Sequence, residues 1–327
     1  MRRFVVPFLA SAMISTLAWS AAPEASIYES AGTTAPETPI DTVVFREFAK
    51  RGIRPTYCTD AVFVRRVYLD VIGTLPTALE VRDFLADTSI KKRQALIDRL
   101  LARDEFADYW AMKWSDLLRI KAEFPVNLWP NAAQAYHHWV RSSIRDNKPY
   151  DRFVREMLVS NGSNFRVGPV NFYRAIQNRT PEGIASAVAL TFMGSRTDAW
   201  PSNRVAGLSV FFSQLSYKPT REWKEEIVFW DPDKAFPAPD ATNAAARAAA
   251  AKRPAPVGVL PDGAKVKLTP DRDPREVFAD WLIAPDNPWF SLNICNRVWA
   301  WLLGRGLIHE PDDIRPGNPA SYPAVLA

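Results

Sequence analysis

The sequence predicts a mainly α protein, a multi-helix globular domain with a small β element near residues 223–268. Two observations support this prediction. Apolar residues recur three or four positions apart in several segments of ten or more residues, which is the spacing of one helix face. A short stretch between Trp223 and Trp230 instead concentrates the β-branched and aromatic residues that are typical of strands.

The composition narrows the class of protein. The 327 residues are 47% hydrophobic and 24% charged, with a formal net charge of +5. This is ordinary globular composition, and it excludes a disordered, collagen-like or polytopic membrane protein. No run of Lys and Arg accompanies the small positive charge, so we expect no nucleic-acid partner. The length allows a sizeable core and suggests two domains.

Residues 1–22 carry the pattern of a secretory signal peptide. Met1 is followed by two arginines, then by an apolar stretch from Phe4 to Trp19 and by small residues at 20–22. We expect cleavage there, with an uncleaved N-terminal anchor as the alternative, and a linker over residues 23–40. No later segment is long and apolar enough to cross a bilayer. We therefore expect an extracytoplasmic protein, periplasmic or secreted, without a transmembrane segment after cleavage.

A helical domain is predicted over residues 41–235. Gly73 ends one helix, and Thr77 with Glu80 forms a capping box that starts the next. Trp110 and Trp114 share an apolar helix face, which favours core packing over a cofactor site. The apolar spacing predicts helices over 61–72, 91–101, 104–120, 131–146, 150–159, 181–193 and 204–215.

Two further parts follow this domain. Residues 236–270 form a linker rich in Pro and Ala, in which 257–268 is predicted to pair with the strand at 223–230 as one small sheet. Residues 271–327 start a second domain. There Asp273, Pro274 and Glu276 combine an N-cap, a first-turn proline and a reciprocal capping carboxylate. Another helix is expected to start at Asn287 and to end before Gly304.

Cys58 and Cys295 are the two cysteines of the chain. Export would permit a disulfide between them. Two separate thiols are equally compatible with the sequence, because it does not reveal whether their Cα atoms approach one another. Neither belongs to a Cys-x-x-Cys pair, which excludes a zinc knuckle and a dithiol redox motif.

Three stretches of the chain resemble a known family. Residues 63–77 (FVRRVYLDVIGTLPT), with Trp110 and Trp114 further on, resemble the opening of the planctomycete cytochrome-c-associated domain family, a domain of unknown function. The strings DNPWF at 286–290, NRVW at 296–299 and GRGL at 304–307 resemble the start of its usual C-terminal partner domain. The resemblance covers residues 40–327. The partner domain normally continues much further. The resemblance therefore implies that this chain is a piece of a longer protein.

The resemblance also bears on haem. Members of the family often carry a Cys-x-x-Cys-His haem-attachment motif after a segment like residues 189–194 (ALTFMG). In this chain the segment is followed by SRTDAWP at 195–201, without Cys or His. The resemblance therefore implies a member that has lost covalent c-type haem. We expect no cofactor, and non-covalent haem and calcium remain open.

The histidines do not predict a metal site. His137 and His138 are neighbours, so they lie about 100° apart on a helix, and no His, Asp or Glu three or four residues later completes a ligand set. We expect His138 to pack beside Trp139 and His309 to be structural in a turn.

The acidic pair near the C-terminal end is a candidate site. Asp312 and Asp313, beside Arg315, offer carboxylates of the kind that calcium prefers. The alternative is an ion pair of Asp313 with Arg297 or Arg305 that fixes the turn.

Two more polar clusters are candidates. Arg65, Arg66 and Asp70 lie together on one predicted helix, and the four-residue spacing of Arg66 and Asp70 favours an ion pair on the helix surface. Asn296 and Arg297 interrupt an apolar helix and must find partners if they are buried. Such a network would define a ligand pocket, an interdomain contact or only the fold.

The sequence therefore favours a secreted, haem-free binding or scaffold protein, with an envelope protein or polymer as its partner. Two alternatives stay open: an extracytoplasmic hydrolase of polysaccharide or another envelope polymer, and a redox partner that holds haem non-covalently or docks a cytochrome. A cleft with exposed Trp and two carboxylates about 5–10 Å apart would favour the hydrolase. An open pocket at His138 would favour the redox partner, and a flat apolar patch would favour the scaffold.

Overall fold

The computed structural model describes residues 27–30, 34–234 and 256–326. The predicted signal peptide (1–22), parts of the linker over 23–40 and the Ala-rich stretch at 240–253 lie outside the described residues. The helices are α1 (Pro39–Lys50), α2 (Asp60–Ile72), α3 (Ala78–Ala86), α4 (Lys92–Leu101), α5 (Asp104–Leu117), α6 (Pro130–Arg145), α7 (Tyr150–Val159), α8 (Asn171–Ala175), α9 (Pro181–Met193), α10 (Ser202–Ser209), α12 (Pro274–Leu282), α13 (Phe290–Leu303) and α14 (Pro323–Leu326).

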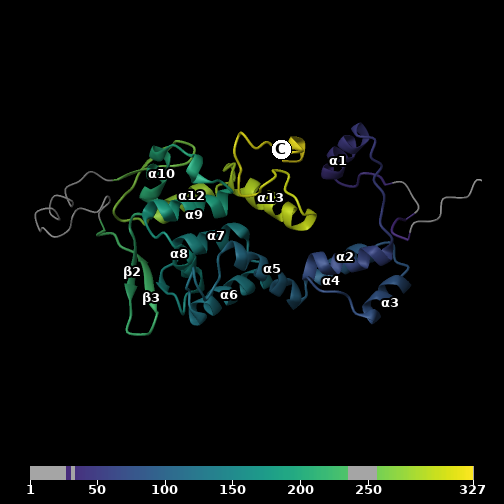
Figure 1. Cartoon of the computed structure of the whole chain (residues 1–327), viewed down its shortest axis with the longest axis horizontal. Coiled ribbons are helices and arrows are strands. Elements are labelled where there is room, and N and C mark those ends of the chain that lie inside the picture. The colour runs from purple at the N-terminus through teal and green to yellow at the C-terminus, as the bar shows by residue number, and fades with distance from the viewer. Residues whose placement is uncertain (1–26, 31–33, 235–255, 327) are drawn as a thin grey trace, which may run out of the picture.

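The molecule is elongated, with α2, α3 and α4 at one end and the hairpin of β2 (Leu215–Pro219) and β3 (Glu226–Trp230) at the other (Figure 1). Helices α5 and α6 run between these ends, and α9, α12 and α13 cover them. The prediction of a mainly α protein with a small β element is confirmed.

The N-terminal end has a small hydrophobic cluster of its own, formed by α2, α3 and α4. Its centre is Val64, Tyr68, Leu96 and Leu100, which are each at most 2% exposed. Gly73 ends α2 in the left-handed conformation (φ 71°), where a Cβ would also meet the ring of Tyr109. This close approach seats the end of α2 against α5.

The predicted capping box at the start of α3 is present. The Thr77 hydroxyl accepts from the amide of Glu80 at 3.3 Å, and the Glu80 carboxylate accepts from the amide of Thr77 at 2.7 Å. The second carboxylate oxygen accepts from Nη1 of Arg103 at 2.8 Å, just before α5. Glu80 therefore joins α3 to the start of α5, and these bonds, led by that to the Thr77 amide, lower its pKa to about 2.

A larger hydrophobic cluster occupies the rest of the molecule. It runs from α5 through α6, α7 and α9 to α12 and the start of α13, and Trp114 packs edge-on against Phe153 and Trp301 within it. Phe278, Leu282 and Phe290 belong to this same cluster. Residues 111–228 of the first predicted part and 278–290 of the second thus contribute to one hydrophobic cluster.

The β element differs from the prediction in its pairing. β3 lies between β2 and the two-residue β1 (Gly162–Ser163), and both pairings are antiparallel. Residues 257–268 instead pair with themselves, as β4 (Val257–Val259) and β5 (Lys265–Lys267). The predicted single sheet is therefore wrong. Both edges of β3 are already occupied, so no edge is left for the later segment.

Two further predictions need correction. The helix expected over 204–215 ends at Ser209, a 3₁₀ turn follows over Val210–Phe212, and Leu215 begins β2 by pairing with Trp230. In the second part, Glu276 does not complete a capping box but lies 3.7 Å from Arg272. Asp273 and Pro274 do start α12 as predicted.

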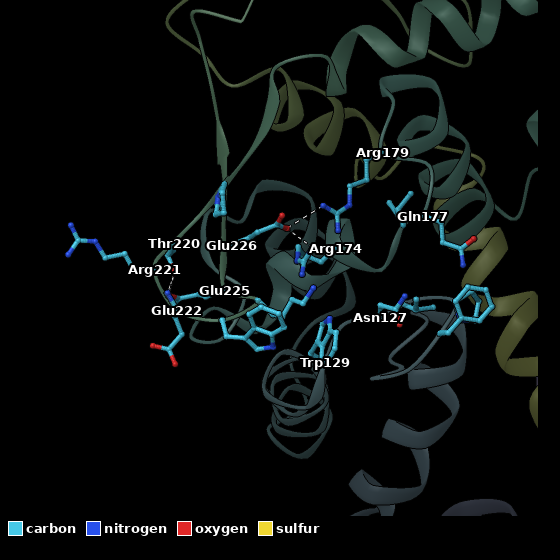
Figure 2. Close-up of a pocket in the computed structure, with 17 residues that line it drawn as sticks. Asn127, Trp129, Arg174, Gln177, Arg179, Thr220, Arg221, Glu222, Glu225 and Glu226 are labelled. Carbon is cyan, nitrogen blue, oxygen red and sulfur yellow. Dashed lines mark hydrogen bonds and ion pairs between the residues drawn. The ribbon is translucent and has the colours of Figure 1, made fainter.

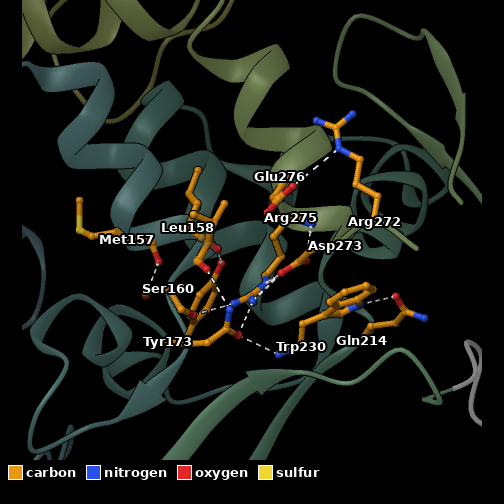
Figure 3. Close-up of polar contacts among 12 residues, drawn as sticks. Met157, Leu158, Ser160, Tyr173, Gln214, Trp230, Arg272, Asp273, Arg275 and Glu276 are labelled. Carbon is orange, nitrogen blue, oxygen red and sulfur yellow. Dashed lines mark hydrogen bonds and ion pairs between the residues drawn. The ribbon is translucent and has the colours of Figure 1, made fainter. Parts of the chain in front are cut away.

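A buried ion pair at the start of α12 joins three segments of the chain (Figure 3). Arg275 is 1% exposed, and its Nε and Nη2 donate to the carboxylate of Asp273 at 2.7 to 3.1 Å. Nη1 donates to the carbonyl of Ser160 at 3.1 Å, and Nη2 to Oδ1 of Asn161 at 2.7 Å. The same Oδ1 accepts from the amide of Trp230 at 2.9 Å. Arg275 thus ties α12 to the end of α7 and to β3.

Both thiols are free: Cys58 is half-buried and Cys295 is exposed. Of the two alternatives left open by the sequence, the structure has the separate thiols. Within the ranges that the structure describes, no helix has the length and apolar character needed to cross a bilayer.

We predict that Arg275→Met lowers the free energy of unfolding by about 3–5 kcal/mol, because it leaves the Asp273 carboxylate buried and unpaired. Urea unfolding followed by circular dichroism measures the change. Arg272→Met is the matched control, because its side chain is 46% exposed and its ion pairs should contribute at most about 1 kcal/mol. Equal losses in the two variants would contradict a special role of Arg275.

We also predict that Glu80→Gln lowers stability in a pH-dependent way. The folded-state pKa of Glu80 lies below its unfolded value, so its contribution is complete above about pH 5 and is lost as the pH falls towards 2. Urea unfolding should give a difference from the parent on the order of 1–2 kcal/mol at pH 7, shrinking between pH 4.5 and 2. Asp70→Asn, in an exposed pair, should have little effect at any pH. A constant Glu80→Gln effect across this range would exclude linkage to the carboxylate.

Candidate functional site

A pocket of about 790 Å³ opens where three segments meet (Figure 2). They are the loop over 124–129 before α6, the end of α8 with the residues that follow it (174–179), and the β2–β3 turn with the strand ends beside it (219–226). The first segment follows α5 at one side of the large core, and the third is the tip of the hairpin. Side chains from distant parts of the sequence therefore face one space.

The backbone of two of these segments is strained. Asn127, Trp129 and Lys224 have φ of 54°, 68° and 63°, a left-handed region that side-chain-bearing residues rarely adopt. Leu128, between the first two, is fully buried, and its amide donates to the carbonyl of Lys121 at 3.1 Å. Packing thus holds the strained loop, and such strain concentrates at functional sites.

Two tryptophans stand at the mouth of the pocket. Trp129 is 38% exposed and Trp223 is 76% exposed, and their rings meet edge to face with centroids 6.3 Å apart. The ammonium of Lys224 lies 4.9 Å from the centroid of the first ring and 4.8 Å from that of the second. The cation fixes the pair while leaving much of the Trp223 surface in water. This surface is available to a ligand.

A buried arginine and a second arginine hold Glu226 inside the pocket (Figure 2). The Arg174 side chain is 8% exposed and its Nη1 contacts the Glu226 carboxylate. Arg179 Nη1 lies 3.3 Å from the same carboxylate, and its guanidinium stacks over the ring of Tyr217 at 4.7 Å. Burial lowers the pKa of Arg174, and Glu226 opposes this shift. Within the described residues, Arg174 Nε has no hydrogen-bond partner.

Glu225 is fixed on the other side of the turn. It is 8% exposed, and its carboxylate accepts from the hydroxyls of Ser163 and, at 2.7 Å, Thr220. These two bonds lower the pKa of Glu225, so it is ionised at neutral pH. The acid of a glycosidase needs a raised pKa in order to keep its proton. Glu225 is thus arranged as a hydrogen-bond acceptor and not as a proton donor.

Charges of both signs line the pocket in similar numbers. Neither sign dominates, which is unlike the surfaces that bind polyphosphates. The pocket presents donors from guanidinium and ammonium groups next to acceptors from carboxylates. The cationic side chains are Arg174, Arg179, Arg221 and Lys224, and the carboxylates are Glu222, Glu225 and Glu226.

The predicted candidates Arg65, Arg66 and Asp70 lie elsewhere, on α2. Arg66 and Asp70 form an exposed pair at 3.4 Å on α2, and Arg65 is exposed on the same helix. These three side chains lie outside the pockets described for the molecule. Their geometry is that of a surface ion pair between helix neighbours.

Asn296 and Arg297 are buried and form the network that their positions require. Asn296 Oδ1 accepts from the amide of Ile308 at 2.9 Å, and its Nδ2 donates to the carbonyl of that residue at 3.1 Å. Arg297 Nη2 donates to Oδ1 of Asn293 at 3.2 Å and to Oδ1 of Asp312 at 2.5 Å. Asn293 in turn donates to a carbonyl of α9. The network joins the two predicted parts of the chain.

Asp312 and Asp313 each meet an arginine. Asp312 pairs with Arg297, whereas both oxygens of Asp313 accept from Nε of Arg315 at 2.9 Å. The predicted pairing of Asp313 with Arg297 or Arg305 is therefore wrong. The turn docks on the end of α9 through a backbone hydrogen bond, which leaves Asp312 facing α13. Across the described ranges, no group of three His, Cys, Asp or Glu is arranged to hold a metal ion.

The predicted packing of His138 is also wrong. His137 and His138 are both exposed on α6, because Trp139 takes the core-facing position and stacks on Phe153 at 4.7 Å. His309 is 57% exposed and lies 3.6 Å from Glu310.

A pocket of about 900 Å³ does lie beside His138. Its lining combines polar side chains, among them Asn131, Gln134 and Arg166, with the rings of Trp139 and Phe165. An open pocket at His138 was the feature expected of a redox partner, so this alternative stays a prediction.

Sequence reasoning missed the residues that build the pocket beside the β2–β3 turn. Two signals could have revealed them. Trp223 is followed directly by Lys224 and two glutamates, and an aromatic residue in so charged a turn cannot reach a core. Arg174 lies in the apolar run FYRAI at 172–176, which is the same signal of a buried charge that singled out Arg297.

Two family models match the chain. Residues 39–199 match the family described as PSCyt2, a protein of unknown function (DUF1549), and residues 274–327 match the one described as PSD1, a protein of unknown function (DUF1553). The matches agree with the resemblance found in the sequence. No curated protein and no solved structure matches the chain. The loop with Trp129 and the turn with Arg174 lie inside the first match, whereas the hairpin turn over 219–226 lies between the two.

Proposed function

We propose that the chain is a secreted, haem-free binding protein that holds a saccharide segment of an envelope or extracellular polymer in the pocket between α6, α8 and the β2–β3 turn. The observation that carries this proposal is the exposed indole of Trp223 beside an array of fixed arginines and carboxylates. The secreted location rests on the leader-like residues 1–22.

The mixed charge supports a polyhydroxyl ligand. A sugar hydroxyl both donates and accepts a hydrogen bond, so a ring with several hydroxyls can meet guanidinium donors and carboxylate acceptors at once. A purely anionic ligand would meet three glutamates among the four cations, and a purely apolar one would leave Nε of Arg174 without a hydrogen-bond partner. An uncharged saccharide suits both sets of groups.

The tryptophans favour a ligand that contains a ring. The apolar C–H face of a sugar ring packs on an indole, and Trp gains large contact area at little cost in conformational entropy. Trp223 offers such a surface next to Glu222 and Lys224, whose polar groups can reach the edge of the same ring. The volume of about 790 Å³ is that of a site for a few sugar units.

Hydrolysis of the bound polymer has weaker support. The surroundings of Glu225 lower its pKa, and Glu226 is engaged by two arginines. A glycosidase needs one carboxyl that keeps its proton at working pH. Binding without cleavage is the function that the geometry of this pocket favours.

We predict that Trp223→Ala weakens saccharide binding at least about tenfold, or ~1.4 kcal/mol, because it removes the exposed stacking surface. Isothermal titration against a panel of soluble polysaccharides, neutral and uronate-rich, first identifies a binding chain and then compares the variants. Reducing-end assays on the same mixtures report any cleavage.

Leu303→Ala is the matched control, because Leu303 is also an exposed apolar side chain (58%) but lies on α13 away from the pocket. Both variants should unfold within about 0.5 kcal/mol of the parent. Binding that survives Trp223→Ala unchanged, or no binding by any member of the panel, would sink the proposal. Release of reducing ends would favour the hydrolase instead.

A further inference from the structure

A second pocket, of about 450 Å³, opens between α5, α9 and α13, on different elements from the first. Its polar lining includes Lys113, Arg119 and Arg297, with Asp116 and Asp312 as the acidic members. Leu117, Leu190 and Trp301 form an apolar wall. Figure 1 shows the three helices that supply it.

Arg297, which lines this pocket, has one buried donor without a partner. Its side chain is 6% exposed, and both of its described bonds, to Asn293 and Asp312, use Nη2. Nε is buried and has no hydrogen-bond partner within the described part of the chain. The hydroxyl of Thr191, which lines the same pocket, is also buried without one. Unpartnered buried donors are costly, and a bound acceptor would relieve this cost.

Arg119 reaches the same pocket from a strained position. Arg119 follows the end of α5 and has a φ of 58°. Its amide donates to the carbonyl of Asp116, and the amide of Ile120 donates to the carbonyl of Ser115. This is the helix-ending motif in which glycine is usual. An arginine there is disfavoured by its backbone, and backbone strain of this kind concentrates at functional sites. The side chain is half-buried, and burial lowers its pKa despite the nearby Tyr136 and Asp312.

We propose that this pocket is a binding site for a small oxyanion, a carboxylate or phosphate group, held by Arg119, Lys113 and the free edge of Arg297. One of the two acids, Asp312, is already paired with Arg297, so the remaining cations exceed the remaining carboxylate. Guanidinium groups bind planar and tetrahedral oxyanions through paired donors. The apolar wall with Trp301 would accept a short organic body attached to the anion.

The site touches both predicted parts of the chain. α5 and α9 belong to residues 41–235 and α13 to residues 271–327, and the Arg297 network crosses between them. A bound anion would therefore fasten α13 to the end of α5. Ligands that bind the folded state raise its stability in a saturable way.

Arg119→Gly tests the proposal with little risk to folding, because glycine is the residue that this backbone position favours. The probes are inorganic phosphate and sodium acetate, titrated at constant ionic strength against chloride. The readouts are the midpoint of thermal unfolding and the heat of binding. For the parent we expect a saturable rise of the midpoint with at least one probe, and for Arg119→Gly a loss of affinity of at least about tenfold.

Asn147→Gly is the matched control. Asn147 has φ 47° and occupies the same motif at the end of α6, where its amide and the next donate to the carbonyls of Ile144 and Ser143, away from the pocket. This variant should keep the response of the parent. Lys113→Gln should weaken it partially.

Three outcomes would overturn the proposal: no saturable response of the parent to either probe, an equal response in Arg119→Gly, or a response to chloride as large as to the probes. A response to acetate alone would assign the site to carboxylates, and one to phosphate alone to phosphate groups. Because no residue of this site lines the first pocket, its failure would leave the saccharide proposal unaffected.

Discussion

The buried pair of Arg275 and Asp273 is the interaction on which the rest of the structure depends. The Arg275 guanidinium is buried and donates hydrogen bonds to the Asp273 carboxylate at the start of α12 and to the Ser160 carbonyl at the end of α7. It also donates to Asn161, which in turn accepts from the amide of Trp230 in β3. Burying such a pair adds little net stability, but losing one partner is costly. Its importance therefore lies in specifying which segments meet. It holds the start of α12 against the end of α7.

Features that depend on neighbours in sequence could be predicted. The capping box of Thr77 and Glu80, the glycine that ends α2, and the bounds of α9 follow from residues that act on the backbone within one turn. The apolar face with Trp114 was assigned correctly to the core for the same reason. Local chemistry decides such features, so their signal is present in any short window.

Features that depend on partners far along the chain could not be predicted from the sequence. The pairing of β3 is decided by the nearness of β2, and the exposure of His138 by Trp139 taking the inward position. The pocket residues come from three separate segments, so no spacing rule joins them. The sequence did indicate that Asn296 and Arg297 needed partners, but only the packed structure identifies these partners as Ile308 and Asp312.

The two ends of strand β3 lie in different surroundings, one beside the buried Arg275 and the other in the pocket. Trp230 is bound to the buried Arg275 system, and Glu226, roughly 13 Å away, faces solvent in the pocket. Because the register is set at the buried end, the exposed residues 221–224 of the turn can be exchanged without disturbing the core. The turn of the hairpin is therefore variable, whereas the strand that carries it is held in place. Relatives that share the helical body could diversify what they recognise there, as antibody loops do on their sandwich.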